Sequence, residues 1–358
     1  MDREPLILVV NPGSTSTKIS VFEGPKEIYT KTLYHSNEEL AKFEHISDQL
    51  EFRVEVIENQ LAQNGFADRK IDAVVGRGGL LHPLEGGTYR VNEKMVEELR
   101  EARYGEHASN LGAIIAYQIG NQHGAPAFIV DPVVVDELDD IARLSGLPEL
   151  PRKSIFHALN QKAVARKAAK RLGKEYSDCT LIVAHMGGGI TVGVHKNGRV
   201  IDVNNGLDGE GPYTPERTGT LPVGDLIRLC YSGKYTRSEM LKKNKGQGGV
   251  VAYLGTNDMR EVERRAVAGE QPWRLVYEGM AYQVAKEICA LAAVVQGKVD
   301  GIVLTGGVAH SKVFTGWIRE RVDFLAPVLE FPGEEEMEAL ALGAYRVLTG
   351  EEEAKEYE

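Results

Sequence analysis

A short unit of strands and turns occurs twice in this sequence, and the repetition constrains the fold more than any other feature does. The first copy begins with the apolar run 6–10 and, after a polar turn, continues through the alternating segment 17–22. The second copy begins with the apolar run 180–184, turns through the glycines at 187–189 and continues through 190–195. Apolar runs and alternating segments of this length are typical of β-strands. Two copies of one unit predict an α/β fold with two duplicated lobes around a central cleft.

Later segments of the chain extend both lobes. Further strands are expected at 27–34, 72–76, 127–131, 200–204, 300–304 and 328–331, and helices at 47–64, 107–122 and 334–348. The last helix is expected to cross back to the first lobe. The predicted domains are therefore an N-terminal lobe of residues 1–132 plus 340–358 and a C-terminal lobe of residues 133–339.

Composition narrows the classes of function. With 42 Lys and Arg against 52 Asp and Glu, the net charge is −10, which disfavours nucleic acid as a partner. Three cysteines without a CxxC pair favour a reducing compartment. Residues 1–5 do not resemble a signal peptide, and the longest apolar run, near 288–295, is far shorter than the ~20 residues of a membrane helix. We expect a cytoplasmic protein without a membrane partner, whose acidic tail at 351–358 is solvated and frayed.

Three glycine-bearing turns at strand ends could bind phosphate groups. The turn at 11–18 offers small residues, backbone N–H groups, hydroxyls and one ammonium, but it lacks the spacing and the following helix of a Walker A loop. It could equally be an ordinary polar hairpin. The glycines at 187–189 would let a ligand approach the backbone, or mark a bulge. The turn at 305–309 stands between a strand and a helix, an order that favours a nucleotide.

A series of short motifs resembles the acetate kinase family, within the superfamily of acetate and sugar kinases, Hsp70 and actin. The motifs are NPGSTSTK at 11–18, GRGG at 76–79, FH at 156–157, HMGGG at 185–189, ERTG at 216–219, NDMR at 257–260, TGG at 305–307 and EALA at 338–341. Their order is specific and spans nearly the whole chain. The resemblance implies two actin-like, ribonuclease H-like lobes. The compact length, the run 209–217 and the run 331–340 are most similar to family members that act on butanoate.

The resemblance implies a reversible kinase reaction, in which the γ-phosphoryl group of ATP passes to butanoate and gives butanoyl phosphate and ADP, with Mg²⁺. Acetate, propionate or isobutyrate remain alternative acids. A chaperone-like ATPase or a nucleotide-binding regulator is an alternative from another class, but either would need an added peptide-binding or DNA-binding part. The family also leads us to expect a homo-oligomer of at least two copies.

The resemblance also assigns residues to roles. The catalytic residues are Arg77, Arg217, Asp131 and His157. The phosphate-binding residues are Asn11, Gly13, Ser14, Ser16, Lys18, His185, Gly187, Gly188 and Gly189. The nucleoside-binding residues are Asp258, Met259, Arg260, Gly306 and Gly307. The acyl pocket is formed by Gly79, His107 and Phe156, and the metal is held by Asp131 and Glu338. His107 and His185 could instead only hold a loop, and Glu338 could be an ordinary acid near a helix N-terminus.

These residue types suit the chemistry. Phosphoryl transfer develops charge on the phosphoryl oxygens, so positioned cations are the main requirement, and an arginine fork matches a carboxylate or a phosphoryl group. The acceptor carboxyl titrates near ~4 and is already ionised at neutral pH, so no general base is needed. Two positions depart from acetate kinases: Gly188 replaces an asparagine and Gly79 replaces a valine. The smaller Gly79 is expected to enlarge the acyl pocket, unless the backbone conformation requires glycine.

Overall fold

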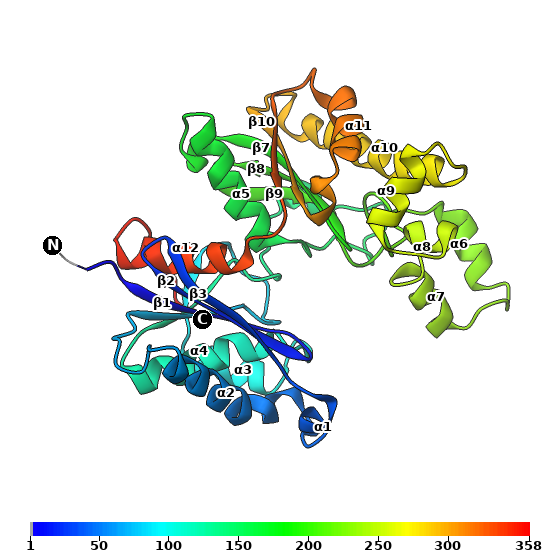
Figure 1. Ribbon diagram of the computed structural model, residues 1–358. Coiled ribbons are helices and arrows are strands. Elements are labelled where there is room, and N and C mark those ends of the chain that lie inside the picture. The colour runs from blue at the N-terminus through cyan, green and yellow to red at the C-terminus, as the bar shows by residue number, and fades with distance from the viewer. Residues whose placement is uncertain (1–2) are drawn as a thin grey trace. The chain divides into compact units, whose positions relative to one another are not determined.

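The computed structural model describes residues 3–358, which divide into two compact units (Figure 1). The first unit takes in the chain up to Val135 together with Glu335–Glu358, and the second is Asp136–Glu334. The sequence analysis placed these divisions at 132/133 and 339/340. Each unit contains one β-sheet with helices on both faces, and each is described separately below.

The first unit is built on a six-stranded sheet with the strand order β3-β2-β1-β4-β6-β5. Its strands are β1 (Leu6–Pro12), β2 (Ser16–Glu23), β3 (Lys26–Tyr34), β4 (Ala73–Gly76), β5 (Thr88–Arg90) and β6 (Ala127–Val130). The first three strands form antiparallel pairs, whereas β4 is parallel to both β1 and β6. Strand β1 lies inside the sheet and is covered on both faces. Its apolar side chains are therefore fully buried.

Helices cover both faces of this sheet. They are α1 (Asn37–Leu40), α2 (Leu50–Gln63), α3 (Glu93–Arg100), α4 (Asn110–His123) and α12 (Glu336–Leu348), with the 3₁₀ turn η1 (Ile46–Gln49). Helices α2, α3 and α4 lie on one face and α12 lies on the other (Figure 1). A Cβ atom at Gly76 would overlap the carbonyl oxygen of Gly112, so two glycines allow β4 and α4 to approach closely. This approach fixes the position of the residue that follows β4.

The second unit contains a five-stranded sheet with the order β11-β10-β7-β8-β9. The strands are β7 (Thr180–Met186), β8 (Ile190–Lys196), β9 (Arg199–Val203), β10 (Gly301–Gly306) and β11 (Val328–Pro332). The pairs β7–β8 and β8–β9 are antiparallel, and β10 is parallel to both β7 and β11. The order of the first three strands therefore repeats that of β1, β2 and β3 in the first unit.

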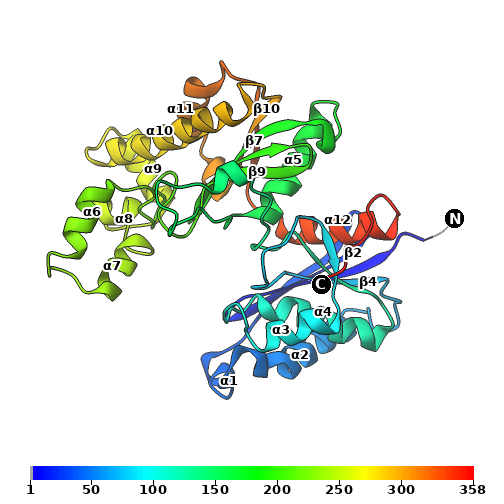
Figure 2. The ribbon, with the colours of Figure 1, turned by 180° about the vertical axis from the view of Figure 1, so that it is seen from behind.

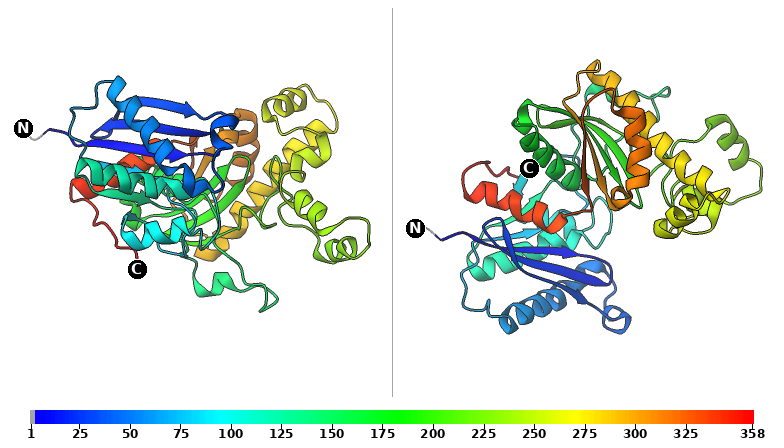
Figure 3. Two further views of the ribbon diagram at one scale, coloured as in Figure 1. Left: turned by 90° about the horizontal axis from the view of Figure 1, so that it is seen from below. Right: turned by 45° about the horizontal axis from the view of Figure 1, so that its top comes forward.

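Helices cover both faces of this second sheet (Figure 3), and two hydrophobic clusters join them to its strands. One joins α5 (Ala158–Arg171) to β7 and β10, and the larger one joins the other face to α9 (Met259–Val267), α10 (Trp273–Ala292) and α11 (Lys312–Val322). The remaining helices are α6 (Val223–Cys230), α7 (Arg237–Asn244) and α8 (Gly249–Leu254), with 3₁₀ turns η2 (Asp140–Arg143), η3 (Tyr176–Asp178), η4 (Ala293–Val295) and η5 (Gly307–His310). Helices α6 and α7 project beyond the sheet of this unit (Figure 2). Among the helices of residues 3–358, none combines the length and the apolar character that a membrane span requires.

The predicted α/β class and the repeated strand order are confirmed by the two sheets. The predicted strands and helices are also present, with boundaries shifted by a few residues. The sequence patterns did not predict β5, the helices α1, α3 and α5, or the helices from α6 to α10. The strand β5 is short, and α6 and α7 bury no side chain, so neither leaves a clear apolar pattern in the sequence.

The acidic tail is ordered against the first unit, so the expectation of a solvated, frayed end is wrong. The backbone N–H of Lys355 donates to Thr88 O at 2.8 Å, and the N–H of Arg90 donates to Lys355 O at 2.9 Å. Tyr357 is only 3% exposed, and its hydroxyl donates to the carboxylate of Glu98. Burial of the Tyr357 ring and the two backbone hydrogen bonds of Lys355 favour the ordered tail, although several acidic residues stand beside them.

Candidate active site

Three predicted site residues of the first unit stand at one edge of its sheet. Asn11 lies at the end of β1, Arg77 follows β4 and Asp131 follows β6. The register brings these strand ends level, because Gly76 at the end of β4 pairs with both parallel neighbours. The carboxyl edge of parallel strands is where α/β sheets commonly bind ligands. The topology therefore gathers an amide, a guanidinium and a carboxylate at that edge.

A glutamate at the start of α12 joins two of these side chains. Glu336 Oε2 accepts hydrogen bonds from Asn11 Nδ2 at 2.8 Å and from Arg77 Nη1 at 3.0 Å. The Arg77 side chain is 42% exposed and that of Glu336 is 24% exposed, so both are partly accessible to solvent. Arg77 is thus already arranged to hold a carboxylate.

The sequence analysis named Glu338 and gave no role to Glu336. Residues two apart on a helix point in different directions, whereas residues seven apart share a face. Gly343, seven residues after Glu336, packs so closely on β6 that a Cβ atom there would overlap Val130. Glu336 therefore lies on the face of α12 that meets the sheet, and the 3.6-residue period of the helix could have indicated this choice.

Asp131 has a left-handed backbone conformation. Its φ angle is 39°, which is uncommon for residues other than glycine, although aspartate adopts it more often than most. The residue is 2% exposed, its Oδ1 accepts the N–H of Gly87 at 2.7 Å, and its own N–H donates to Gly87 O at 3.0 Å. Strained backbone conformations of this kind cluster at functional sites. The strand end at Asp131 is therefore held in place by its exchange of bonds with Gly87.

The loop at 11–18 is organised by a buried arginine that the sequence analysis missed. Arg53 of α2 is 1% exposed, and its guanidinium donates to the carbonyl oxygens of Gly13 at 2.9 Å, Ser16 at 3.0 Å and Ser14 at 3.1 Å. Burial lowers the pKa of Arg53 to about 10, so the side chain remains charged at neutral pH. The carbonyl groups of the loop are turned towards Arg53, while Ser14 and Lys18 are exposed.

The second unit builds a comparable edge from β7, β10 and β11. His185 of β7 pairs in register with Thr305 of β10, which also pairs with β11. His185 Nδ1 lies 2.7 Å from Asn160 Oδ1, which also accepts the hydroxyl of Thr305 at 3.3 Å. On its other side, His185 Nε2 lies 3.0 Å from the carboxylate of Glu334. His185 is 1% exposed, so these partners fix its ring.

His157 stacks on His185 with a centroid separation of 3.8 Å and an interplanar angle of 11°. Its Nδ1 lies 2.9 Å from the hydroxyl of Thr191, and Gln161 donates to the same hydroxyl at 2.8 Å. Because the hydroxyl of Thr191 holds Nδ1 of His157, the orientation of the imidazole is set before any ligand binds. The Cε1 atom of this ring lies 3.3 Å from the position that a Cβ atom would take at Gly189.

Arg217 lies directly on the glycine loop 187–189. A Cβ atom at Gly189 would overlap Arg217 Nη1, so only glycine permits this contact. Arg217 Nη1 donates to Gly206 O at 2.6 Å, while Nε is buried and has no hydrogen-bond partner among residues 3–358. Burial lowers the pKa of the Arg217 guanidinium, although not enough to neutralise an arginine. A buried guanidinium N–H without a partner is suited to an anionic ligand.

The remaining predicted nucleoside residues fall into two groups. Gly306 has a φ of 88° and packs on the backbone of Met186, directly before the glycine loop, and Gly307 faces open space. Asp258 instead caps α9 by accepting the N–H of Arg260, whose side chain is 94% exposed, and Met259 is partly buried against the larger core. Asn257, which precedes this second group, donates to Glu216 at 3.4 Å, and the Glu216 carboxylate in turn lies 3.7 Å from the would-be Cβ of Gly188 in the glycine loop.

Comparisons with known proteins agree with this arrangement. The model of the acetokinase family matches residues 149–326. The chain is 59% identical to butyrate kinase 2 of Clostridium acetobutylicum over 351 residues, which cover 98% of this chain and 99% of that protein. The chain belongs to the acetokinase family. It is therefore a phosphotransferase with a carboxyl group as acceptor and ATP as co-substrate.

Solved structures show the same fold. Acetate kinase of Porphyromonas gingivalis is 20% identical with a TM-score of 0.78, and the match covers 96% of this chain and 100% of that one. A propionate kinase of Francisella tularensis is also 20% identical with a TM-score of 0.72, and the match covers 95% of this chain and 98% of that one.

Gly188 of the glycine loop stands where acetate kinases have an asparagine. A Cβ atom at Gly188 would lie 3.7 Å from the carboxylate of Glu216. The hydroxyl of Thr214 donates to Gly188 O at 2.8 Å and fixes the loop there.

The structure describes the surroundings of each of the three residues predicted for the acyl pocket. A Cβ atom at Gly79 would lie 2.6 Å from Asn110 Cα and 2.7 Å from Leu99 Cδ2, so the space is already filled. His107 Nδ1 accepts the N–H of Ser109 at 3.2 Å just before α4 begins. Phe156 belongs to the second unit and is 3% exposed. Gly79 therefore packs closely on Leu99 of α3 and Asn110 of α4, and this packing favours the alternative that the local conformation requires glycine.

We expect Gly79→Val to reduce activity with butanoate and with acetate in parallel. A valine would push the β4 end away from α4, at a cost of about 1–3 kcal/mol in stability, and would displace Arg77 whatever the acid. The measurement is kcat/KM for both acids together with the melting temperature. Gly146→Val is the matched control, because Gly146 has no neighbour within 4 Å of its would-be Cβ. A loss confined to butanoate would restore the pocket role of Gly79.

Proposed function

We propose that this chain transfers the γ-phosphoryl group of ATP to butanoate, giving butanoyl phosphate and ADP in a reversible reaction. The observation that carries the proposal is Arg77 at the edge of the first sheet, which already holds the carboxylate of Glu336. A planar guanidinium binds a substrate carboxylate in the same way. Butanoate is the acid of choice because the curated relative named butyrate kinase 2 matches almost the full length of both chains.

In the proposed step, a carboxylate oxygen of butanoate attacks the γ-phosphorus as the bond to ADP breaks. No proton has to be removed, since the acid is ionised at neutral pH. Arg217 supplies a cation to the phosphoryl oxygens, where charge develops, and the His157 ring contributes a donor held by Thr191. Asn11 and the hydroxyls of the loop 13–16, with Lys18, bind phosphate oxygens in the first unit, and the glycine loop 187–189 binds them in the second.

The nucleoside is proposed to lie along Gly306 and Gly307 and the start of α9. Gly307 leaves open space next to a strand end, which lets a ligand approach the backbone. The exposed side chains of Asp258 and Arg260 offer an acceptor and a donor to the sugar or the base. His185, held between Asn160 and Glu334, acts in this proposal by supporting the loop on which the phosphates rest.

Magnesium fits this proposal with few protein ligands. Residues 3–358 contain no group of three or more His, Cys, Asp or Glu side chains arranged as a metal site. Magnesium bound to phosphates, however, needs only one or two carboxylates, with water filling the other positions. Asp131 supplies one. Glu338 was the second predicted from the sequence, and we now propose Glu336, which lies at the same sheet edge as Asn11. The ion would neutralise charge on the β- and γ-phosphates.

A panel of acids tests the function and the chain length together. With ATP, Mg²⁺ and hydroxylamine to trap the acyl phosphate, we expect the highest kcat/KM with butanoate. Each buried methylene contributes ~0.8 kcal/mol, so two methylenes favour butanoate over acetate by roughly tenfold. The structural relatives named acetate kinase and propionate kinase make those acids the important competitors, with isobutyrate as the branched one. A maximum at acetate would contradict the butanoate proposal, and ADP release without any hydroxamate would indicate an ATPase.

We further propose a homo-oligomer in the cytoplasm, where ATP is available and Cys179, Cys230 and Cys289 remain unpaired. Helix α6 exposes Val223 by 66% and Ile227 by 53% on one face. The segment 223–245 carries six basic and two acidic side chains within a chain of net charge −10. An apolar, basic hairpin in an acidic chain suits contact with a second copy.

We expect Ile227→Glu to lower the particle mass measured by light scattering, because it places a charge in the apolar face of α6. Glu239→Gln on α7 is the control, because it changes charge on the same hairpin without altering the apolar face. An unchanged assembly in Ile227→Glu, or a monomeric parent protein, would exclude this face as the contact between copies.

A further inference from the structure

The guanidinium of Arg217 is held by a loop to which the sequence analysis assigned no role. This loop, 204–210, follows β9, and its Gly206 carbonyl accepts Arg217 Nη1 at 2.6 Å. The N–H of Gly206 donates in turn to Ile155 O at 2.9 Å. Because Nε of Arg217 has no partner among residues 3–358, the position of the Gly206 carbonyl largely sets the direction of the guanidinium.

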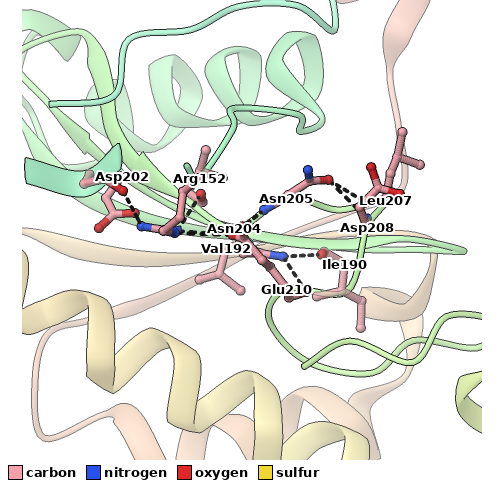
Figure 4. Close-up of polar contacts among 11 residues, drawn as sticks. Arg152, Ile190, Val192, Asp202, Asn204, Asn205, Leu207, Asp208 and Glu210 are labelled. Atoms are coloured by element: carbon pink, nitrogen blue, oxygen red, sulfur yellow. Dashed lines mark hydrogen bonds and ion pairs between the residues drawn. The ribbon is translucent and has the colours of Figure 1, made fainter. Parts of the chain in front are cut away.

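Side chains within the loop give it a fixed shape (Figure 4). Asn205 Oδ1 accepts the N–H groups of Leu207 at 2.9 Å and Asp208 at 3.2 Å. The N–H of Asn205 donates to the carboxylate of Glu210 at 3.1 Å. Glu210 therefore closes the loop on the Asn204–Asn205 peptide unit, while Asn205 Oδ1 holds the N–H of Leu207, which shares a peptide unit with the Gly206 carbonyl.

Asn204 connects the loop to the strand that follows the glycine loop. Its Oδ1 accepts the N–H of Val192 at 2.7 Å, and its Nδ2 donates to Ile190 O at 3.1 Å and to Glu210 O at 3.4 Å. Asn204 is 1% exposed, so water does not compete for these bonds. The carbonyl that orients Arg217 and the strand end at Ile190 are thus parts of one hydrogen-bonded structure.

Arg152 contacts the same carboxylate oxygen of Glu210 as the N–H of Asn205 does. Its Nε and Nη2 atoms lie 3.4 Å from Glu210 Oε2, and Nη1 donates to Asp202 Oδ1 at 2.8 Å (Figure 4). Nη2 also donates to Val203 O at 3.0 Å, which ties the arginine to β9. One oxygen of Glu210 is therefore shared between a partly buried arginine and the loop backbone.

We propose that Glu210 is a positioning residue for phosphoryl transfer, acting through Asn205 and the Gly206 carbonyl on Arg217. The proposal rests on the proposed role of Arg217. Loss of the carboxylate releases the N–H of Asn205, lets the Gly206 carbonyl move and misdirects the guanidinium. A displacement of about 1 Å at a catalytic group can lower the rate ~100-fold, although Glu210 itself touches no substrate.

A double-mutant cycle separates positioning from general stabilisation. In the otherwise unchanged protein, Glu210→Ala is expected to lower kcat by ~10-fold to ~100-fold while KM for ATP and butanoate changes by about twofold or less. In an Arg217→Ala background, the same substitution is expected to change kcat by about twofold or less, because there is no guanidinium left to misdirect. Glu210→Gln keeps an acceptor for the N–H of Asn205 and should retain most of kcat.

The matched control is Glu278→Gln. Glu278 pairs with Arg321 at 3.1 Å between α10 and α11, so this variant removes an ion pair of the same unit without touching the loop. It should leave kcat unchanged. Melting curves establish that each variant is folded, and if Glu210→Ala melts below the assay temperature, Arg152→Met carries the same cycle with the same expected pattern.

The outcomes distinguish this inference from the proposed function. Equal losses from Glu210→Ala in both backgrounds, or no loss in the folded protein, would overturn the positioning role while leaving acyl phosphate formation intact. Full activity of Arg217→Ala would overturn the proposed function itself. A loss of kcat that disappears in the Arg217→Ala background supports the inference.

Discussion

The parallel pairing of β4 with β1 and β6, and of β10 with β7 and β11, determines where chemistry can take place in each unit. Parallel strands bring their carboxyl ends to one edge, so residues far apart in the sequence meet there. In the first unit these residues are Asn11, Arg77 and Asp131. In the second they include His185 and the turn at Gly306. The duplicated order of strands explains why two anion-binding edges exist in one chain.

The proposed function requires both edges to bind anions within a chain of net charge −10, and each edge has an arginine whose direction is fixed by a hydrogen-bond partner. Arg77 is paired with the carboxylate of Glu336, which a substrate acid can replace. Arg217 is held by the neutral carbonyl of Gly206, so its full charge remains available to phosphate. Each partner suits the proposed ligand. The Glu336 carboxylate occupies the place on Arg77 that is proposed for the substrate carboxylate, and the neutral Gly206 carbonyl leaves the charge of Arg217 for the proposed phosphoryl group.

The sequence predicted what depends on local pattern and missed what depends on packing between distant segments. Apolar runs located the strands, and glycines marked the turns at strand ends that are proposed to bind phosphate. The contact of Glu336 with Asn11 and Arg77 depends on which face of α12 meets the sheet, and finding that face required the helix period and its neighbours. Arg53, Tyr357 and the filled space at Gly79 depend on contacts across many residues, which one sequence does not reveal. The acidic composition of the tail concealed its one aromatic anchor.

In the proposed mechanism, Arg77 of the first unit binds the acid and takes no part in binding the nucleotide. Calorimetric titration of Arg77→Ala with butanoate and with ADP tests it most directly. The account predicts that butanoate binds about tenfold more weakly or worse, because a charge-assisted bond is lost, while the Kd of ADP stays within about twofold. Unchanged binding of butanoate by a folded Arg77→Ala protein would contradict the account.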